Sequence, residues 1–161
     1  MDSQPLTFDV MAAPDFIAGF IYGMTGDNHL EEIETCMQGG EDLFTDINTV
    51  FEDFFSGEFV AGLAEVGSII LEFPTDLANC QNMDEDIQAI EQWAQIFTNP
   101  VELAETLAKD WLFHGSEIMT DLAMCETDWE AGQYYNSGID FAAALTTAVG
   151  PIQGIYYVEK Q

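Results

Sequence analysis

Apolar side chains recur every three or four residues along most of the chain, with acidic and other polar residues between them. This spacing places the apolar residues on one face of an α-helix. The runs end at Gly, Pro or Asn residues, which set the expected helix boundaries. Helices are predicted over residues 14–25, 28–38, 43–55, 59–73, 75–80, 82–97, 99–122 and 127–149.

Two of these helices are expected to be irregular. Gly115 is expected to kink the helix that starts at Asn99-Pro100, and Ser137-Gly138 is expected to break the last helix. Helical periodicity accounts for the whole region between the two ends of the chain. The pattern therefore predicts an all-α fold.

The two ends of the chain differ from its middle. Residues 6–10 alternate between apolar and polar side chains, and residues 154–158 are rich in residues that favour strands. Both ends fit short extended arms, although frayed termini would look the same. The expected division is an N-terminal arm at 1–13, a single all-helical domain at 14–151 and a C-terminal arm at 152–161.

The three cysteines mark an internal repeat, because they lie at positions 36, 80 and 125 and so are 44 and 45 residues apart. Residues 75–80 read TDLANC and residues 120–125 read TDLAMC, while residues 32–36 are a weaker echo. A helical hairpin cannot bury its apolar stripe alone, so repeated hairpins are expected to stack. The predicted architecture is a helical bundle of about three stacked hairpin repeats of ~45 residues each. Chance likeness between Phe- and Ala-rich helices is the alternative.

The charge of the chain is extreme, with 30 acidic residues against 2 basic ones and a formal net charge of −28. Nucleic-acid binding and docking to anionic lipids both need a basic surface, so we exclude them. A total of 43 residues are Leu, Ile, Val or Phe, which is about 27 % and above the roughly 20 % of disordered chains. The carboxylates are therefore expected around a filled core, where salt, acid or divalent cations would relieve their repulsion.

The cysteines and histidines do not form a recognisable metal motif. There is no CxxC pair, and neither His29 nor His114 has the spacing from a cysteine that zinc sites use. The cysteines fit small buried packing residues, while one disulfide with a free thiol, or an intermolecular bond, stays open.

Clusters of acidic residues are the remaining candidates for ligand binding. They are Glu31-Glu32-Glu34, Glu41-Asp42, Glu52-Asp53 and Asp84-Glu85-Asp86. They could bind divalent cations weakly at the surface, but solvated helix faces and helix N-termini explain them more simply. Segments 27–29 and 84–86 lack the spacing of a calcium-binding loop. We therefore predict no catalytic, cofactor-binding or metal-ligating residue, and no enzyme.

Several short segments carry a family resemblance: GFIYG at 19–23, DNHL at 27–30, NP at 99–100, HGSEI at 114–118 and AVGP at 148–151. With them the chain resembles a group of small all-helical proteins of ciliates and other protists. The resemblance covers most of residues 15–151. It implies an all-helical fold and implies no catalytic residue.

These observations predict a non-enzymatic structural or interaction protein that self-assembles into an oligomer or filament under cation or pH control. The expected partner is another copy of the chain or a cationic protein, with terminal arms joining neighbours by strand addition. The alternative is a carrier that holds an apolar small molecule between helices. Its cavity would be lined by Phe51, Phe54, Phe55, Trp93, Trp111 and Phe113.

Neither a signal peptide nor a membrane span is expected. Residues 1–10 contain no basic residue and no apolar core, and the uncharged stretch 141–158 is interrupted by Gly and Pro. We expect a soluble chain, and an extracellular or lumenal location would fit a mature form without its leader.

Overall fold

The computed structural model describes residues 11–37, 41–80 and 83–150, and every regular element in these ranges is a helix. The predicted all-α class is thereby confirmed. In chain order the elements are α1 (Ala12–Thr25), α2 (Leu30–Cys36), α3 (Glu41–Phe55), α4 (Phe59–Leu71), α5 (Phe73–Asp76), α6 (Asp84–Trp93), the 3-10 helix η1 (Ala94–Thr98), α7 (Pro100–Glu130) and α8 (Tyr134–Val149). The strand-like segments expected at the two ends lie outside the described residues.

Helix α1 starts two residues earlier than the sequence pattern predicted. Ala12 and Ala13 are helical and buried, so the last residues assigned to the N-terminal arm belong to the helical domain. Pro14 lies in the first turn, where its missing N–H would have had no intrahelical acceptor. The helix ends at Gly26, whose φ of 82° is left-handed and whose N–H donates to the Tyr22 carbonyl at 2.8 Å.

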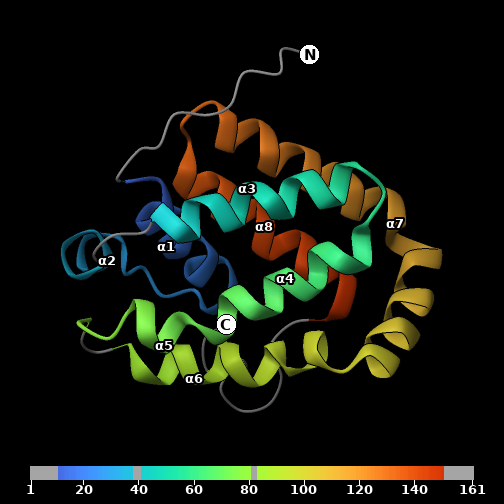
Figure 1. The fold of residues 1–161 in the computed structure, drawn as a ribbon, viewed down its shortest axis with the longest axis horizontal. Helices are drawn as coiled ribbons and strands as arrows, with labels where there is room; N and C mark the ends of the chain where they lie inside the picture. The colour runs from blue at the N-terminus through green and yellow to red at the C-terminus, as the bar shows by residue number, and fades with distance from the viewer. Residues whose placement is uncertain (1–10, 38–40, 81–82, 151–161) are drawn as a thin grey trace.

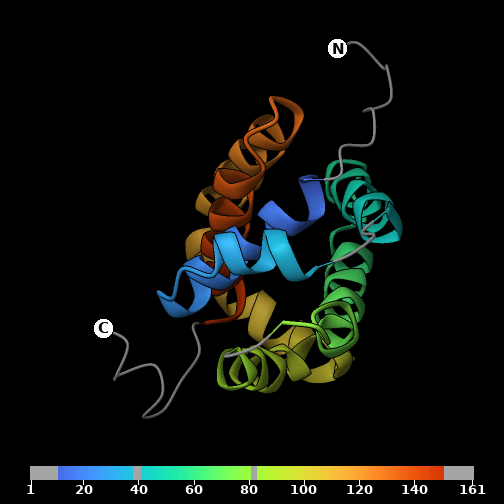
Figure 2. The same ribbon diagram turned by 90° about the vertical axis from the view of Figure 1, so that its left-hand side faces the viewer.

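The helices form two sides of a core. Figure 2 shows the α3–α4 hairpin on one side and α7 with α8 on the other, with α1 between them. Phe16 and Phe20 of α1 meet Phe51 of α3, Phe73 of α5 and Phe141 of α8 around a cavity of about 20 Å³. The interior is thus filled by aromatic and branched side chains.

Glycines allow α1 and α8 to cross at close range. A Cβ atom on Gly19 would collide with the backbone carbonyl oxygen of Tyr135, and one on Gly138 would collide with that of Phe16. The prediction that Ser137-Gly138 breaks the last helix is therefore wrong, because both residues are helical and buried at this crossing. The chain turns earlier, at residues 131–133, where Gly132 has a φ of 82°.

Helix α7 spans the region that the sequence pattern divided between two helices. It is continuous through Gly115 and Thr127 to Glu130, and Figure 1 shows its ribbon changing direction about midway. It starts at Asn99, whose side-chain oxygen accepts a hydrogen bond from the Glu102 N–H at 3.1 Å. The Asn99-Pro100 start predicted from the sequence is thus confirmed.

The stacking of consecutive hairpins stays a prediction. Helix α1, from the first expected unit, packs along α8, from the last one (Figure 1). The three cysteines also differ in setting, because Cys36 and Cys80 form a disulfide outside the helix interiors while Cys125 lies within α7. The similar segments that end at Cys80 and Cys125 therefore have different surroundings in the fold.

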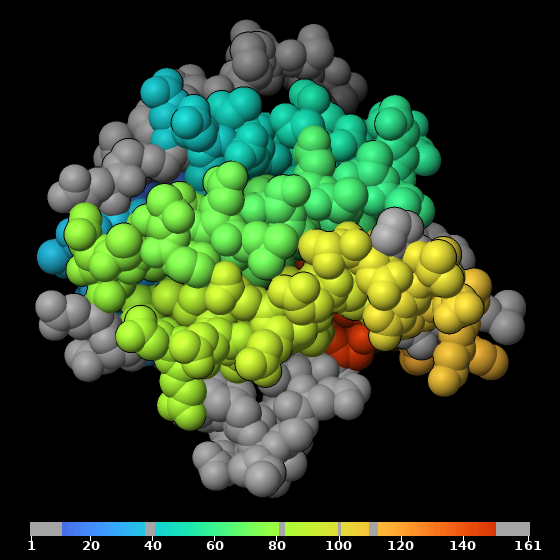
Figure 3. All heavy atoms as spheres, turned by 60° about the horizontal axis from the view of Figure 1, so that its bottom comes forward, coloured from blue at the N-terminus to red at the C-terminus, as the bar shows by residue number. Residues whose placement is uncertain are grey.

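The face shown in Figure 3 runs from α3 and α4 to α5, α6, η1 and the first turns of α7, and the end of α8 reaches it beside η1 and α7. The Trp93 indole N–H, at the end of α6, donates to the Gly150 carbonyl at 2.6 Å and fixes the end of α8 there. Across the described ranges, each helix is too short or too polar to span a bilayer.

Candidate functional site

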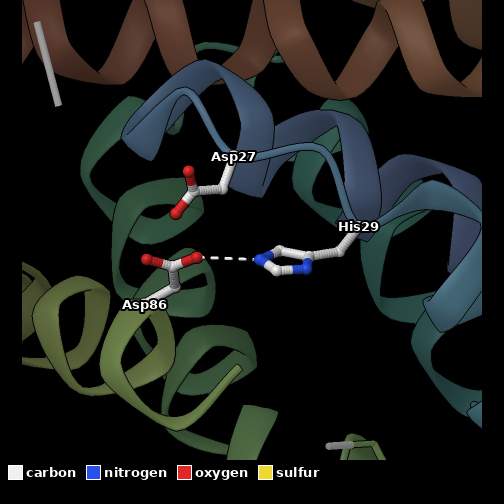
Figure 4. Close-up of side chains that lie close together, drawn as sticks. All are labelled: Asp27, His29 and Asp86. Carbon is white, nitrogen blue, oxygen red and sulfur yellow. Dashed lines mark hydrogen bonds and ion pairs between the residues drawn. The ribbon is translucent and has the colours of Figure 1, made fainter. Parts of the chain in front are cut away.

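The loop between α1 and α2 directs two side chains towards the start of α6. The Thr25 hydroxyl accepts a hydrogen bond from the Asp27 N–H at 3.1 Å, and the Asn28 side-chain oxygen accepts one from the Leu30 N–H at 2.9 Å. These bonds set the exit from α1 and the entry to α2. Asp27 and His29 are thereby held on the side of the loop that faces α6 (Figure 4).

Asp27, His29 and Asp86 converge at this place, although Asp86 is 57 residues from His29 in sequence. The His29 Nε2 atom lies 2.8 Å from Asp86 Oδ2, and one ligand atom from each of the three residues lies within 4.8 Å of the others. Asp86 is buried in the first turn of α6, whereas the other two are half-buried. Figure 4 shows the two carboxyl groups facing one another beside the imidazole ring.

A second carboxylate faces the other nitrogen of the same ring. His29 Nδ1 lies 3.3 Å from Oε1 of Glu32, one turn into α2. An ionised carboxylate only accepts hydrogen bonds, and a neutral imidazole has a single N–H. The ring therefore satisfies both contacts only if this group of side chains also holds an additional proton or another cation.

Burial is the main influence on the pKa of the Asp86 carboxyl. It raises the pKa of the Asp86 carboxyl; the His29 hydrogen bond lowers that pKa, while a hydrogen bond and the charge of Asp27 raise it again. The helix N-terminus at α6 favours negative charge at this position. The net direction is upward, so the buried carboxylate is costly without a cation beside it.

A disulfide joins the same two parts of the chain. Cys36, the last residue of α2, is bonded to Cys80, before α6, with their Cα atoms 5.1 Å apart. Of the alternatives left open by the sequence, the structure therefore has one disulfide with a free thiol. The bond holds α2 against the segment that leads into α6, and it thereby supports the approach of His29 to Asp86.

A second group of carboxyls lies between α7 and α8. The pKa of Asp140 is raised to about 7, mainly by burial. A hydrogen bond with Asp128 and the negative charges of Asp128 and Asp121 add to this rise. Burial and Glu117 raise the pKa of Asp121 as well. This group can take up protons on mild acidification.

A third group lines a groove of about 170 Å³ between α3 and α4, with Asp46 from α3 facing Glu65 and Glu72. Burial raises the pKa of Asp46, Glu65 and Asp76, and neighbouring carboxylates add to each rise. The acidic clusters identified in the sequence consist of residues that are neighbours along the chain. The structure brings together carboxyls from different helices.

The other residues considered from the sequence have simpler surroundings. His114 is half exposed and lies 3.4 Å from Glu117, one turn further along α7. Cys125 is fully buried, burial raises the pKa of its thiol, and its Sγ atom contacts the Ser137 carbonyl at 3.1 Å. This cysteine is a packing residue, as the sequence suggested for all three.

The aromatic residues proposed to line a carrier cavity are dispersed. Phe51 and Phe54 are buried in the core, whereas Phe55 and Phe113 are exposed by 41 % and 74 %. The central apolar cavity of about 20 Å³ is far below the 300–1,000 Å³ of typical ligand pockets. Nothing about this cavity favours a carrier.

Comparison with known proteins identifies a family. A family model described as SctB-like, secreted protein B-like, matches residues 3–155. No curated protein and no solved structure matches the chain. The resemblance to small helical proteins of protists stays a prediction.

Proposed function

The chain belongs to the SctB-like (secreted protein B-like) family, and from that premise we propose that it is a secreted, non-enzymatic protein that self-assembles when acid or cations neutralise its carboxylates. The family description supports secretion. The Cys36–Cys80 disulfide supports it as well, because disulfides persist in oxidising compartments such as the extracellular space.

The observation that carries the assembly proposal is the pair formed by Asp128 and Asp140. Asp121, also on α7, is the further charged group that acts on Asp140. The Asp140 pKa of about 7 means that a fall in pH from neutral removes a negative charge from the surface of the α7–α8 hairpin. Asp46 and Asp76 act in the same direction on the α3–α4 side. Protonation at these places lowers both internal repulsion and repulsion between copies.

The overall charge explains why such groups would control association. Two copies with a net charge of −28 repel one another strongly at low salt. Exposed apolar side chains on α7 offer contact area once that repulsion falls. Phe113 and Met124 are exposed by 74 % and 53 %. Another copy of the chain is the partner that this proposal favours.

Size-exclusion chromatography with light scattering tests the proposal on the full, disulfide-bonded chain. The chain is run in chelator at about pH 7.5, in millimolar Ca²⁺ at the same pH, and in chelator at about pH 5. We expect a monomer in the first condition and larger species in the other two. A truncated variant lacking residues 1–10 and 152–161 tests the terminal arms, and we expect it to assemble less. If every condition gives a monomer, the proposal fails.

A further inference from the structure

We propose that Asp27, His29 and Asp86 form an intramolecular binding site for a divalent transition-metal ion of the Zn²⁺ class. This inference goes beyond self-assembly, because all three side chains come from one chain (Figure 4). The site is therefore expected to fill in the monomer. Sequence spacing alone gave no sign of it, since the ligands come from a loop and from a helix far along the chain.

The ligand atoms have the right chemistry and nearly the right separation. Zn²⁺ takes imidazole nitrogen and carboxylate oxygen at about 2.0–2.2 Å, which places tetrahedral ligands roughly 3.3–3.6 Å apart. The His29 Nε2 and Asp86 Oδ2 atoms are 2.8 Å apart, and no pair in the trio exceeds 4.8 Å. Asp27 lies in the loop between α1 and α2, so a rotation of its side chain can close the remaining gap. Solvent would complete the fourth position.

The second ring nitrogen of His29 supplies an independent observation. Histidines that bind metals almost always donate the other ring N–H to a carboxylate or a carbonyl, which fixes the tautomer and the ring orientation. Glu32 occupies that position, with its Oε1 atom 3.3 Å from Nδ1. In the tautomer that carries its proton on Nδ1, His29 presents its Nε2 lone pair to the two aspartates.

The site lies in a strongly acidic chain. The chain has only two basic residues, and Lys109 lies on α7. Among the described residues, every ion pair uses a histidine. Asp27, Glu32 and Asp86 place three carboxyl groups around one imidazole, so an added cation would offset negative charge here.

The same ligands distinguish between classes of metal ion. Ca²⁺ takes six to eight oxygen ligands and Mg²⁺ prefers six, so neither is well served by two carboxylates and a nitrogen. Imidazole favours Zn²⁺, Cu²⁺ and Ni²⁺. The disulfide adds rigidity, because Cys36 follows His29 by seven residues and Cys80 precedes Asp86 by six. It thereby reduces the freedom that metal binding would otherwise have to remove.

Calorimetric titration with Zn²⁺ tests the site on the full, disulfide-bonded chain. Millimolar Mg²⁺ is present throughout to occupy weak carboxylate sites, and the salt concentration is about 0.15 M. We expect one saturable Zn²⁺ per chain. Glu32→Gln is expected to weaken binding by about 10- to 100-fold, and His29→Gln or Asp86→Asn by at least as much.

The chain provides matched controls for both ligand variants. His114, like His29, has a glutamate partner three residues later in the sequence. Asp27 and Asp86, however, lie beside His29. His114→Gln is therefore expected to leave the affinity unchanged. Asp84→Asn, in the same first turn of α6 as Asp86, is expected to do the same.

Nuclear magnetic resonance of the ring nitrogens gives a readout that does not depend on any variant. The chain has two histidines, so their signals separate easily. Zn²⁺ is expected to shift the His29 Nε2 signal, leave Nδ1 protonated and leave His114 unaffected. Absence of a saturable site, equal loss of binding in His114→Gln, or unchanged His29 signals would each overturn the inference. A chain that assembles without binding Zn²⁺ overturns this inference alone.

Discussion

Removal of the Cys36–Cys80 disulfide should destabilise the chain by an amount that follows from its loop length. The bond joins residues 44 positions apart. In the chain-entropy model, closing a loop of this size stabilises the folded state by about 4 kcal/mol. The total free energy of unfolding of a typical domain is only about 5–15 kcal/mol. We therefore expect a large share of the stability to depend on this bond.

The corresponding change in melting temperature can be calculated from the chain length. For 161 residues, the entropy of unfolding is about 340 cal/mol/K near 60 °C, so a loss of 4 kcal/mol lowers the Tm by about 12 °C. Thermal unfolding followed by circular dichroism, with and without reductant, measures this shift. The double variant Cys36→Ser/Cys80→Ser should match the reduced wild type.

Cys125 provides the control for the effect of reductant. It is free and buried, so Cys125→Ala should retain the full response to reductant, whereas the double variant should show none. A shift of the wild-type Tm below about 3 °C on complete reduction would refute the loop-entropy argument. It would mean that residual structure already restrains the reduced, unfolded chain.

Two further predictions concern the helix crossing and the carboxyl pair. Gly138→Ala should lower the free energy of unfolding by about 1–3 kcal/mol in chemical denaturation, because its Cβ would meet the Phe16 carbonyl; an increase in stability would contradict the close crossing. The pKa of Asp140 is raised in the folded state, so the stability that it contributes is fully present below its unfolded value near 3.8 and is lost as the pH rises through about 7. The Tm of the wild type should therefore rise on acidification from about pH 8 to about pH 5. Asp140→Asn should raise the Tm at about pH 8 and flatten the dependence of Tm on pH, whereas the exposed control Glu31→Gln should do neither. A wild-type Tm that falls between about pH 8 and about pH 5 would contradict this prediction.

Local pattern predicted the helices because their boundaries depend on local chemistry. The Asn99-Pro100 start and the end of α1 at Gly26 both rest on hydrogen bonds from a backbone N–H to an acceptor three or four residues away. Gly138 shows where such reasoning fails. A glycine can end a helix or permit close contact with another helix, and only the partner decides between the two. The spacing of Gly19 from Gly23, and of Gly138 from Ala142, was the available signal.

The candidate metal site could not be predicted for a similar reason. Segments 27–29 and 84–86 form it, and neither segment alone has the spacing of a calcium-binding loop. The site exists only when the loop between α1 and α2 lies against the start of α6, and the Cys36–Cys80 disulfide supports this arrangement. Three cysteines allow three such pairings, and the sequence did not distinguish them. Had this pairing been assumed, the flanking His29 and Asp86 would have been the natural residues to test.

Sedimentation velocity of the full, disulfide-bonded chain tests the central claim, that neutralising the carboxylates causes association, most directly. The measurement compares the chain in chelator at about pH 8 with the same sample brought to about pH 5 at constant ionic strength. The account predicts a 17.9 kDa monomer at the higher pH and larger, reversible species at the lower pH. A 17.9 kDa species at both pH values, and also in millimolar Ca²⁺, would contradict it.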